Sequence, residues 1–208
     1  MLQTKTIEPG ALSLLKKITQ FPELNSFSLV GGTALALYYG HRSSVDLDFF
    51  STVDFSNDTI IAVLEKKFKG FVYRSANNPI GVFGFIDNIK VDFVKHHHHV
   101  MIEKPYEEDG LRLFSKPDII AMKISAILRR AVKKDFFDMA EILRHYSVKD
   151  IIGFHDKKYP TQQLLISIPQ AITYFDDAEE SEEPRSLKGQ TWESVKKTIQ
   201  QKVSDYLR

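Results

Sequence analysis

A strand–glycine–helix–strand unit near the start of the sequence constrains the fold more than any other feature. Residues 27–30 form a short apolar stretch that is typical of a buried strand, and the two glycines directly after it break that strand. The run TALALYY at residues 33–39 is rich in Ala and Leu and therefore favours a helix, with Thr33 as its expected cap. After a polar loop, apolar and acidic side chains alternate over residues 45–50, which predicts a second strand.

The second of these strands carries two carboxylates. Side chains at alternate strand positions point to the same side, so Asp46 and Asp48 are expected to share one face, with backbones roughly 6 to 7 Å apart. Like charges this close repel unless a cation lies between them, and Mg²⁺ prefers such oxygen ligands. The pattern predicts a magnesium site, although it also occurs on the solvated face of antiparallel sheets. The opposite face is expected to carry Val45, Leu47 and Phe49.

The glycine pair before the helix supplies the other half of the predicted site. Gly31 and Gly32 allow a phosphate to approach the backbone closely, and the helix that follows presents free N–H groups to it. A glycine pair alone is a weak signal. In this order and at this distance from the two aspartates, it predicts a site for a metal ion and a nucleoside triphosphate.

The rest of the chain divides into a front half of mixed pattern and a helical back half. The front half is expected to contain two helices and then three strands, at residues 10–20, 57–68, 71–76, 81–87 and 89–94. From Lys116 onward, apolar residues recur at helical spacing over four segments, at residues 117–132, 135–146, 162–175 and 191–207. We therefore predict an α/β (α+β) fold, with a mixed-sheet lobe at residues 1–114 and a helical lobe at residues 115–208.

Composition excludes several classes of protein. The chain has 28 Lys and Arg against 27 Asp and Glu, so there is no overall basic field, and any binding of a polyanion must be local. The absence of cysteine excludes disulfides and thiolate metal sites. No window approaches the roughly 20 apolar residues of a membrane span, and the start lacks a signal-peptide pattern. We expect a cytoplasmic protein without a membrane partner.

Two distant motifs make the sequence similar to the AbiEii/AbiGii type IV toxin family, within the DNA polymerase beta nucleotidyltransferase superfamily. The first motif joins a GGT start to the pattern R-x-S-x-D-x-D, here Arg42, Ser44, Asp46 and Asp48. The second is the helical pattern D-x(4)-K-x(6)-R-x(3)-[KR]-D-x-x-D, here Asp118, Lys123, Arg130, Lys134, Asp135 and Asp138. The third carboxylate of the superfamily would be Asp92, in a predicted strand. The resemblance spans residues 28–143 and implies a polymerase beta-like core followed by a helical lobe.

The resemblance implies a Mg²⁺-dependent enzyme that transfers a nucleotide from a nucleoside triphosphate to an acceptor hydroxyl. It also implies an acceptor such as the 3′ end of tRNA, and a cognate antitoxin. In a two-metal scheme, Asp46 and Asp48 would bridge the ions, while Asp92 would hold the ion that activates the acceptor and would serve as general base. The expected catalytic residues are Asp46, Asp48, Asp92, Lys123 and Asp135. The expected nucleotide-binding residues are Gly31, Gly32, Thr33, Arg42, Ser44, Arg130 and Lys134.

The basic residues of the second motif have an alternative role. Lys123, Arg130 and Lys134 fall on one face of a predicted helix, where they could contact phosphates or form a solvated stripe. Asp135 and Asp138 could orient these cations. For Asp138, the simpler interpretation is an ordinary ion pair with Lys134, four residues earlier on the same helix.

Two features beside the predicted carboxylate strands are ambiguous. Arg42 could hold a phosphate through its planar guanidinium, or it could be an exposed loop arginine.

Four histidines occupy residues 96–99, directly after a predicted strand. If that strand continues, His96 and His98 share the face of Asp92 and could touch a base or a phosphate, whereas an exposed strand end is the alternative.

Two rival functions stay open at this point. One is a nucleotidyltransferase that modifies a protein or a small molecule, which the near-neutral charge favours over RNA. The other is a non-catalytic module that binds nucleotides. The presence of all three carboxylates and the motif lysine argues against such a module, because a decayed site usually loses at least one of them.

Overall fold

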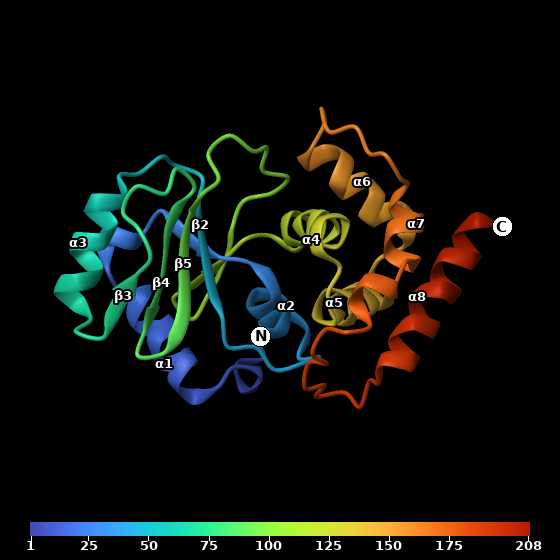
Figure 1. The fold of residues 1–208 in the computed structure, drawn as a ribbon, viewed down its shortest axis with the longest axis horizontal. Helices are drawn as coiled ribbons and strands as arrows, with labels where there is room; N and C mark the ends of the chain where they lie inside the picture. Colours follow the sequence, from blue (N-terminus) through green and yellow to red (C-terminus); the bar gives the residue numbers. More distant parts are fainter.

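A computed structural model describes residues 1–208 as a mixed sheet followed by a helical half (Figure 1). The strands are β1 (Phe27–Leu29), β2 (Leu47–Ser51), β3 (Phe71–Tyr73), β4 (Gly81–Ile86), β5 (Ile89–Lys95), β6 (Tyr106–Glu108) and β7 (Leu111–Leu113). They form one seven-stranded sheet in the order β3-β4-β5-β2-β1-β7-β6. The pairs β2–β5 and β1–β7 are parallel and the others are antiparallel. The predicted mixed α/β class is therefore confirmed.

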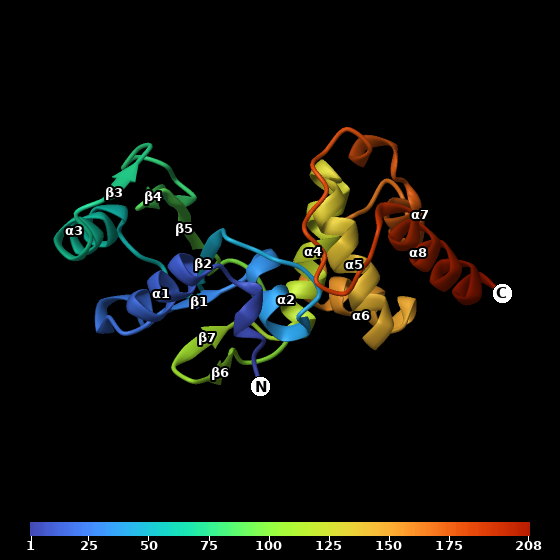
Figure 2. The ribbon, with the colours of Figure 1, turned by 90° about the horizontal axis from the view of Figure 1, so that it is seen from below.

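The helices lie on both sides of this sheet. They are α1 (Pro9–Ile18), α2 (Gly31–Tyr39), α3 (Asn57–Lys67), α4 (Lys116–Arg130), α5 (Lys133–His145), α6 (Val148–Lys158), α7 (Ile168–Thr173) and α8 (Trp192–Leu207). In Figures 1 and 2, α1 and α3 lie on one side and α4 to α8 on the other. Helix α2 contacts β2, α4 and α5, so it joins the sheet to the helical half. No helix combines the length and the apolar character that crossing a membrane requires.

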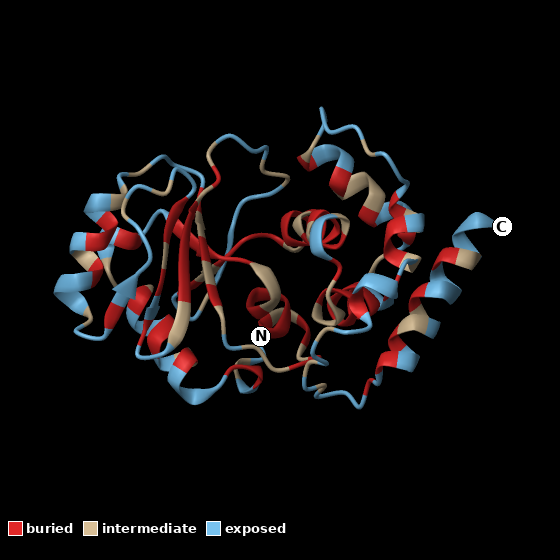
Figure 3. Ribbon diagram, in the orientation of Figure 1, coloured by how far each residue is buried: buried red, intermediate tan, exposed pale blue.

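Side chains alternate along the central strands, so one face of the sheet is apolar and the other is polar. Phe49 of β2 and Phe93 of β5 are buried and stacked, with ring centroids 5.3 Å apart, on the face covered by α1 and α3. Asp48 and Asp92 alternate with them and therefore point to the opposite face. Val45 departs from the expectation: β2 begins at Leu47, and Val45 is exposed. Burial is also dense in α2 and in α5, which lie between the sheet and the outer helices (Figure 3).

Several elements differ from the sequence prediction. Strands β6 and β7 were not predicted. They form a hairpin around Asp109 and Gly110, both with positive φ, which is the turn chemistry that joins two strands most tightly. Helix α6 was also not predicted, and the helix expected at residues 162–175 is limited to α7. The two helices that the second motif spans are separated at Ala131, whose φ of 38° ends α4.

The predicted boundary between residues 114 and 115 falls between β7 and α4. One hydrophobic cluster of 48 buried residues nevertheless includes side chains from both halves, among them Leu35 of α2 and Ile120 of α4. The division of the chain into two separate domains therefore stays a prediction.

Candidate active site

Strands β2 and β5 bring two of the predicted carboxylates side by side. Asp48 and Asp92 are partners in the parallel register, so their backbones lie about 4.8 Å apart on neighbouring strands. Asp92 is buried, while the side chain of Asp48 is about a third exposed. Asp46 lies just before β2 and is also partly exposed, with its Oδ2 3.8 Å from Lys134 Nζ. Asp46 and Asp48 thus lie at the start of β2, and Asp92 lies beside Asp48 at the middle of β5.

Lys90 lies between two of these carboxylates and is the residue that sequence reasoning missed. Its ammonium donates a hydrogen bond to Asp92 Oδ2 and lies 3.5 Å from Asp48 Oδ1. Burial raises the pKa of Asp92, and the hydrogen bond from Lys90 works against that rise. Burial tends to lower the pKa of Lys90, but the Asp92 contact raises it overall. The position was readable as K-x-D on one strand, because residues two apart share a face.

The carboxylates are suited to a further cation. Asp92 Oδ1 is buried and has no hydrogen-bond partner, which leaves one carboxylate oxygen with unused lone pairs. No three histidine or acidic side chains converge into a ready-made metal cage. The reason is visible in the contacts of the three aspartates: Lys134 lies beside Asp46, and the Lys90 ammonium already lies between Asp48 and Asp92.

Each glycine of the pair lies against a side chain that leaves no room for a Cβ atom. Gly31 begins α2 with a φ of 71°, and a Cβ there would lie 2.8 Å from Asp48 Oδ2. A Cβ on Gly32 would collide with the guanidinium of Arg42. The glycines therefore let the start of α2 approach the carboxylate strand and the ion pairs behind it.

Thr33 does not cap α2, contrary to the expectation. Helix α2 begins two residues earlier, at Gly31, and its N-cap Val30 offers no side-chain hydrogen bond. The Thr33 hydroxyl instead bonds the backbone carbonyl of Asp46 and lies 2.7 Å from Ser44 Oγ. These contacts tie α2 to the segment that enters β2, and so they fix the position of Asp46.

Asp138 is the centre of a buried ion-pair network behind the glycine pair. Its carboxylate accepts two hydrogen bonds from Arg42, at 2.6 Å from Nε and 2.9 Å from Nη2. His41 Nε2 lies 2.7 Å from Oδ1, and Lys123 Nζ lies 2.7 Å from Oδ2. Burial alone would raise the pKa of Asp138, but Arg42 and Lys123 hold it well below its usual range. Arg42 is consequently not an exposed loop arginine.

Asp135 continues the same network toward the solvent. Its carboxylate accepts hydrogen bonds from Lys123 Nζ at 2.7 Å and from Arg130 Nε at 3.0 Å. Burial would raise the pKa of Asp135, whereas Lys123 and Arg130 lower it overall. Asp135 and its partner Lys123 are buried, but about half of the Arg130 side chain is exposed. Arg130 is therefore the member of this network that solvent or a ligand can reach.

The three motif cations do not share one helix face. Lys123 and Arg130 belong to α4, whereas Lys134 belongs to α5 and lies beside Asp46. The expectation of a single helical stripe is wrong, because the backbone breaks between Arg130 and Lys133. The break nevertheless turns Lys134 toward the carboxylates.

The remaining motif residue, Asp118, anchors the loop between β5 and β6. It accepts a hydrogen bond from the fully buried Lys158 at 2.8 Å, and it also accepts from the backbone N–H groups of Ile102 and Glu103. Ser115 completes its set of donors. Asp118 thus holds the loop and α6 together at some remove from the carboxylates.

The histidine run does not continue β5. The strand ends at Lys95, so the condition under which His96 and His98 would share the face of Asp92 does not hold. His96 is buried between the rings of Phe50 and Phe114, and this burial lowers its pKa to about 3. His96 is a neutral core residue, and the next histidines are progressively more exposed.

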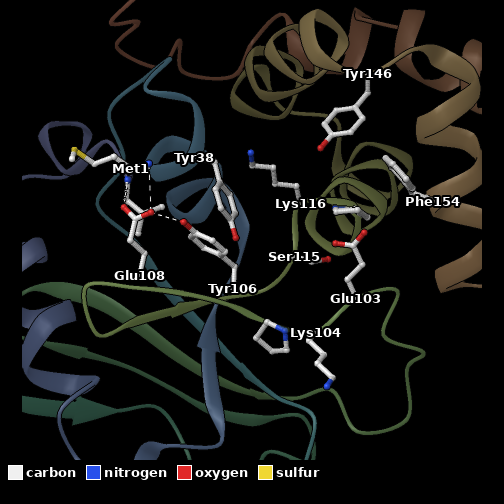
Figure 4. Close-up of a pocket in the computed structure, with 13 residues that line it drawn as sticks. Met1, Tyr38, Glu103, Lys104, Tyr106, Glu108, Ser115, Lys116, Tyr146 and Phe154 are labelled. Carbon is white, nitrogen blue, oxygen red and sulfur yellow. Dashed lines mark hydrogen bonds and ion pairs between the residues drawn. The ribbon is translucent and has the colours of Figure 1, made fainter.

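A separate cavity of about 540 Å³ lies at the other end of α2 (Figure 4). Tyr38, Tyr106 and Tyr146 line it, together with Lys116, whose ammonium lies over the ring of Tyr38. Figure 4 shows these side chains around the opening between the N-terminus and α4. None of the predicted site residues lines this cavity.

Comparisons with known proteins identify the family and the fold. A family model described as "Nucleotidyl transferase AbiEii toxin, Type IV TA system" matches residues 13–203. An uncharacterized protein of Aquifex aeolicus is 32% identical over 204 residues, which cover 93% of this chain and 94% of that protein. Among solved structures, the nucleotidyltransferase toxin MenT4 from Mycobacterium tuberculosis aligns with a TM-score of 0.54 at 16% identity, over 95% of this chain and 86% of that chain.

Proposed function

The chain belongs to the AbiEii nucleotidyl transferase toxin family, and we propose that its transfer reaction takes place where β2, β5 and the start of α2 meet. The observation that carries this proposal is the pairing of Asp48 with Asp92 beside Gly31, next to a buried Asp92 oxygen that has no partner. Carboxylates gathered beside a close backbone approach suit the polyphosphate and cation that nucleotidyl transfer requires.

In the proposed reaction, the acceptor hydroxyl oxygen forms a bond to the α-phosphorus of a nucleoside triphosphate. The bond from that phosphorus to the bridging oxygen of the β-phosphate breaks, and pyrophosphate leaves. The hydroxyl proton passes to Asp92, whose pKa is raised by burial. Such a carboxylate is a stronger base than an exposed aspartate, which suits it to accept this proton.

The carboxylate set fits Mg²⁺. We propose that Asp46, Asp48 and Asp92, which form no closed metal cage in this structure, would hold the ion together with the triphosphate oxygens, Asp92 through its unpartnered Oδ1. When bound, Mg²⁺ neutralises charge on the phosphates and activates the acceptor oxygen. The ammonium of Lys90 lies between two of these carboxylates, which supports the proposal that a cation is favoured there.

The proposed roles of the basic residues follow from their exposure. Arg130 and Lys134 are about half exposed near the carboxylates, so we assign them to the triphosphate, along with the backbone N–H groups of Gly31 and Gly32. Thr33 and Ser44, which bond each other beside Asp46, would orient that carboxylate for the same ligand. These assignments distribute nucleotide binding over α2, α4 and α5.

Three of the expected site residues are enclosed by their own partners. Lys123 and Asp135 are buried in mutual ion pairs, and Arg42 is buried against Asp138. We propose that these residues position α2, α4 and α5 around the nucleotide without touching the reacting atoms. Asp135 acts on the nucleotide through Arg130, which it orients.

We further propose that the acceptor is RNA, as at the 3′ end of tRNA, and that a cognate antitoxin opposes this activity. The family description, which assigns its members to type IV toxin–antitoxin systems, supports the second part. A protein or a small molecule is the alternative acceptor, and the near-neutral net charge of +1 is the observation in its favour.

One experiment tests the site and the acceptor together. The protein is incubated with Mg²⁺ and each α-³²P-labelled nucleoside triphosphate, in the presence of total RNA, soluble protein or a low-molecular-weight extract. We expect label in the RNA with wild-type protein and no label with Asp46→Asn, with unchanged circular dichroism. The matched control is Asp58→Asn, which alters an exposed aspartate on α3. Full transfer by Asp46→Asn would refute the site, and label in protein or small molecules would refute the acceptor.

A further inference from the structure

The polar face of the sheet continues past the carboxylates onto an exposed aromatic surface. The antiparallel register pairs Phe83 of β4 with Asp92, and Phe85 with Lys90. Partners in register share a face of the sheet, so both phenylalanines lie on the carboxylate side. Val72 of β3 pairs in turn with Phe85. We call Val72, Arg74, Phe83 and Phe85 the aromatic face.

This surface is open, unlike the opposite face of the same strands. Phe85 is 37% exposed and Val72 is 60% exposed, and Phe83 is half-buried. On the other side of β4, which α3 contacts, Val82 and Ile86 are completely buried, and Figure 3 shows the burial of this strand. Neighbouring large apolar side chains exposed together, next to a catalytic centre, are the kind of surface that marks a binding site.

The aromatic face includes one cation that has no ion-pair partner. Arg74 follows β3, is exposed and forms no ion pair, and its backbone N–H bonds the carbonyl of Phe83. Lys90 borders the surface on the next strand. The Lys90 ammonium is already ion-paired with Asp48 and Asp92, so Arg74 is the cation of this surface that has no ion-pair partner, and it lies beside two aromatic rings.

The aromatic face lies within a few ångströms of the proposed reaction centre at Asp92. Neighbouring strands lie about 4.8 Å apart, and residues two apart on a strand lie roughly 7 Å apart. Phe83 is thus one strand from Asp92, and Phe85 is one further step along β4. A chain of nucleotides whose terminal hydroxyl reaches Asp92 would lay its next bases over these two rings.

We propose that the aromatic face binds the single-stranded end of a nucleic acid acceptor, with bases stacked on Phe83 and Phe85 and phosphates near Arg74. This proposal rests on the proposed function, since the strand end must lie at Asp92. Aromatic side chains on an open sheet are a recurrent platform for unpaired bases. An enclosed small molecule would instead favour a cavity, and the large cavity of Figure 4 lies at the far end of α2.

Binding is measured without catalysis, so the result does not depend on turnover. A 5′-fluorescein-labelled single-stranded RNA of mixed sequence is titrated with protein, and fluorescence anisotropy gives the dissociation constant at fixed salt. For Phe83→Ala/Phe85→Ala we expect the constant to rise about tenfold or more, because each stacked base contributes substantially. A fluorescent triphosphate should bind this variant as it binds wild type. Phe83→Tyr/Phe85→Tyr should bind RNA as wild type does, since tyrosine also stacks.

The controls separate this proposal from the function it rests on. Tyr206→Ala removes an exposed aromatic ring from α8, far along the chain, and should leave RNA binding unchanged. Asp48→Asn should abolish nucleotide transfer and retain RNA binding. A variant that loses transfer but still binds RNA therefore tests the proposed active site and not the aromatic face. Absence of RNA binding by wild type, or wild-type binding by the double alanine variant, would overturn the proposal. Conversion of a dimer to a monomer by that variant would also overturn it, because the surface would then be a subunit interface.

Discussion

Lys90 donates a hydrogen bond to Asp92, two residues further along the same strand, and its ammonium also lies 3.5 Å from Asp48. The lysine therefore balances one of the two carboxylate charges from within the sheet. A divalent ion that binds Asp48 and Asp92 must share this space with the ammonium or displace it. The affinity of the site for metal is expected to be lower than that of the carboxylates alone, because like charges repel.

Replacing Lys90 with methionine should strengthen metal binding. Methionine keeps the length of the side chain and removes one positive charge a few ångströms from the ion, worth about 1 kcal/mol, or roughly fivefold in affinity. Mn²⁺ titration followed by electron paramagnetic resonance measures this directly. Lys95→Met is the matched control, because Lys95 lies on the same strand but pairs with Asp54. Equal or weaker Mn²⁺ binding by Lys90→Met would contradict the competition.

Gly31→Ala should destabilise the protein and impair transfer. The φ of 71° is strained for alanine, and the added Cβ would meet Asp48 Oδ2 at 2.8 Å. We expect a loss of about 1 kcal/mol or more in unfolding free energy, measured by urea denaturation, together with a fall in kcat.

The control for this change is Gly153→Ala in α6. A Cβ at Gly153 meets nothing within 4 Å, so alanine should be neutral or should stabilise the helix by up to about 1 kcal/mol. If Gly31→Ala behaves like Gly153→Ala, the close approach of α2 to Asp48 is not a constraint on the fold.

Local patterns predicted the parts of the fold whose partners are near in sequence. The strand, the glycine break, the Ala- and Leu-rich helix and the alternating strand were each readable from a few residues, and the register then brought Asp48 beside Asp92. The hairpin of β6 and β7 escaped because each strand has three residues, too short for alternation to stand out. Helix α6 escaped because its apolar face is interrupted by charged residues near its end.

The candidate site was predictable in its residues but not in their pairing. Arg42 and Asp138 meet across 96 positions of sequence, so nothing local indicates that the arginine is buried. Lys123 was similarly predicted to contact phosphates, with a solvated stripe as the alternative, whereas it lies buried between Asp135 and Asp138. Such contacts depend on how α2, α4 and α5 pack, which is a property of the whole fold.

Asp138→Asn should cost the protein much of its stability. The substitution leaves Arg42 and Lys123 buried with one carboxylate fewer, and breaking a buried ion pair in this way costs about 3 to 5 kcal/mol. Chemical denaturation measures the loss. Arg144→Met provides the control, because Arg144 is half exposed and 3.7 Å from Glu141, where an ion pair contributes about 1 kcal/mol or less. Similar losses in the two variants would mean that the network is not the anchor of the helical half.

Buried His96 should make the protein less stable as the pH falls below about 6.5. Its pKa is lowered to about 3 in the fold, chiefly by burial and then by Lys158. Below the pKa of an unfolded histidine, about 6.5, the unfolded chain takes up a proton that the folded chain refuses, so unfolding becomes easier. Neutral His96 therefore costs the protein no stability above pH 6.5. The free energy of unfolding then falls as the pH drops from 6.5 toward the folded-state pKa of about 3.

His96→Asn should remove this part of the pH dependence. Between pH 7 and pH 5, we expect the unfolding free energy of wild type to fall by roughly 1 to 2 kcal/mol more than that of the variant. Urea denaturation at the two pH values measures the difference. His98→Asn is the control, because it replaces an exposed histidine of the same segment and leaves the buried one in place. An identical pH dependence in His96→Asn and wild type would mean that His96 takes up its proton in the folded protein as readily as in the unfolded chain.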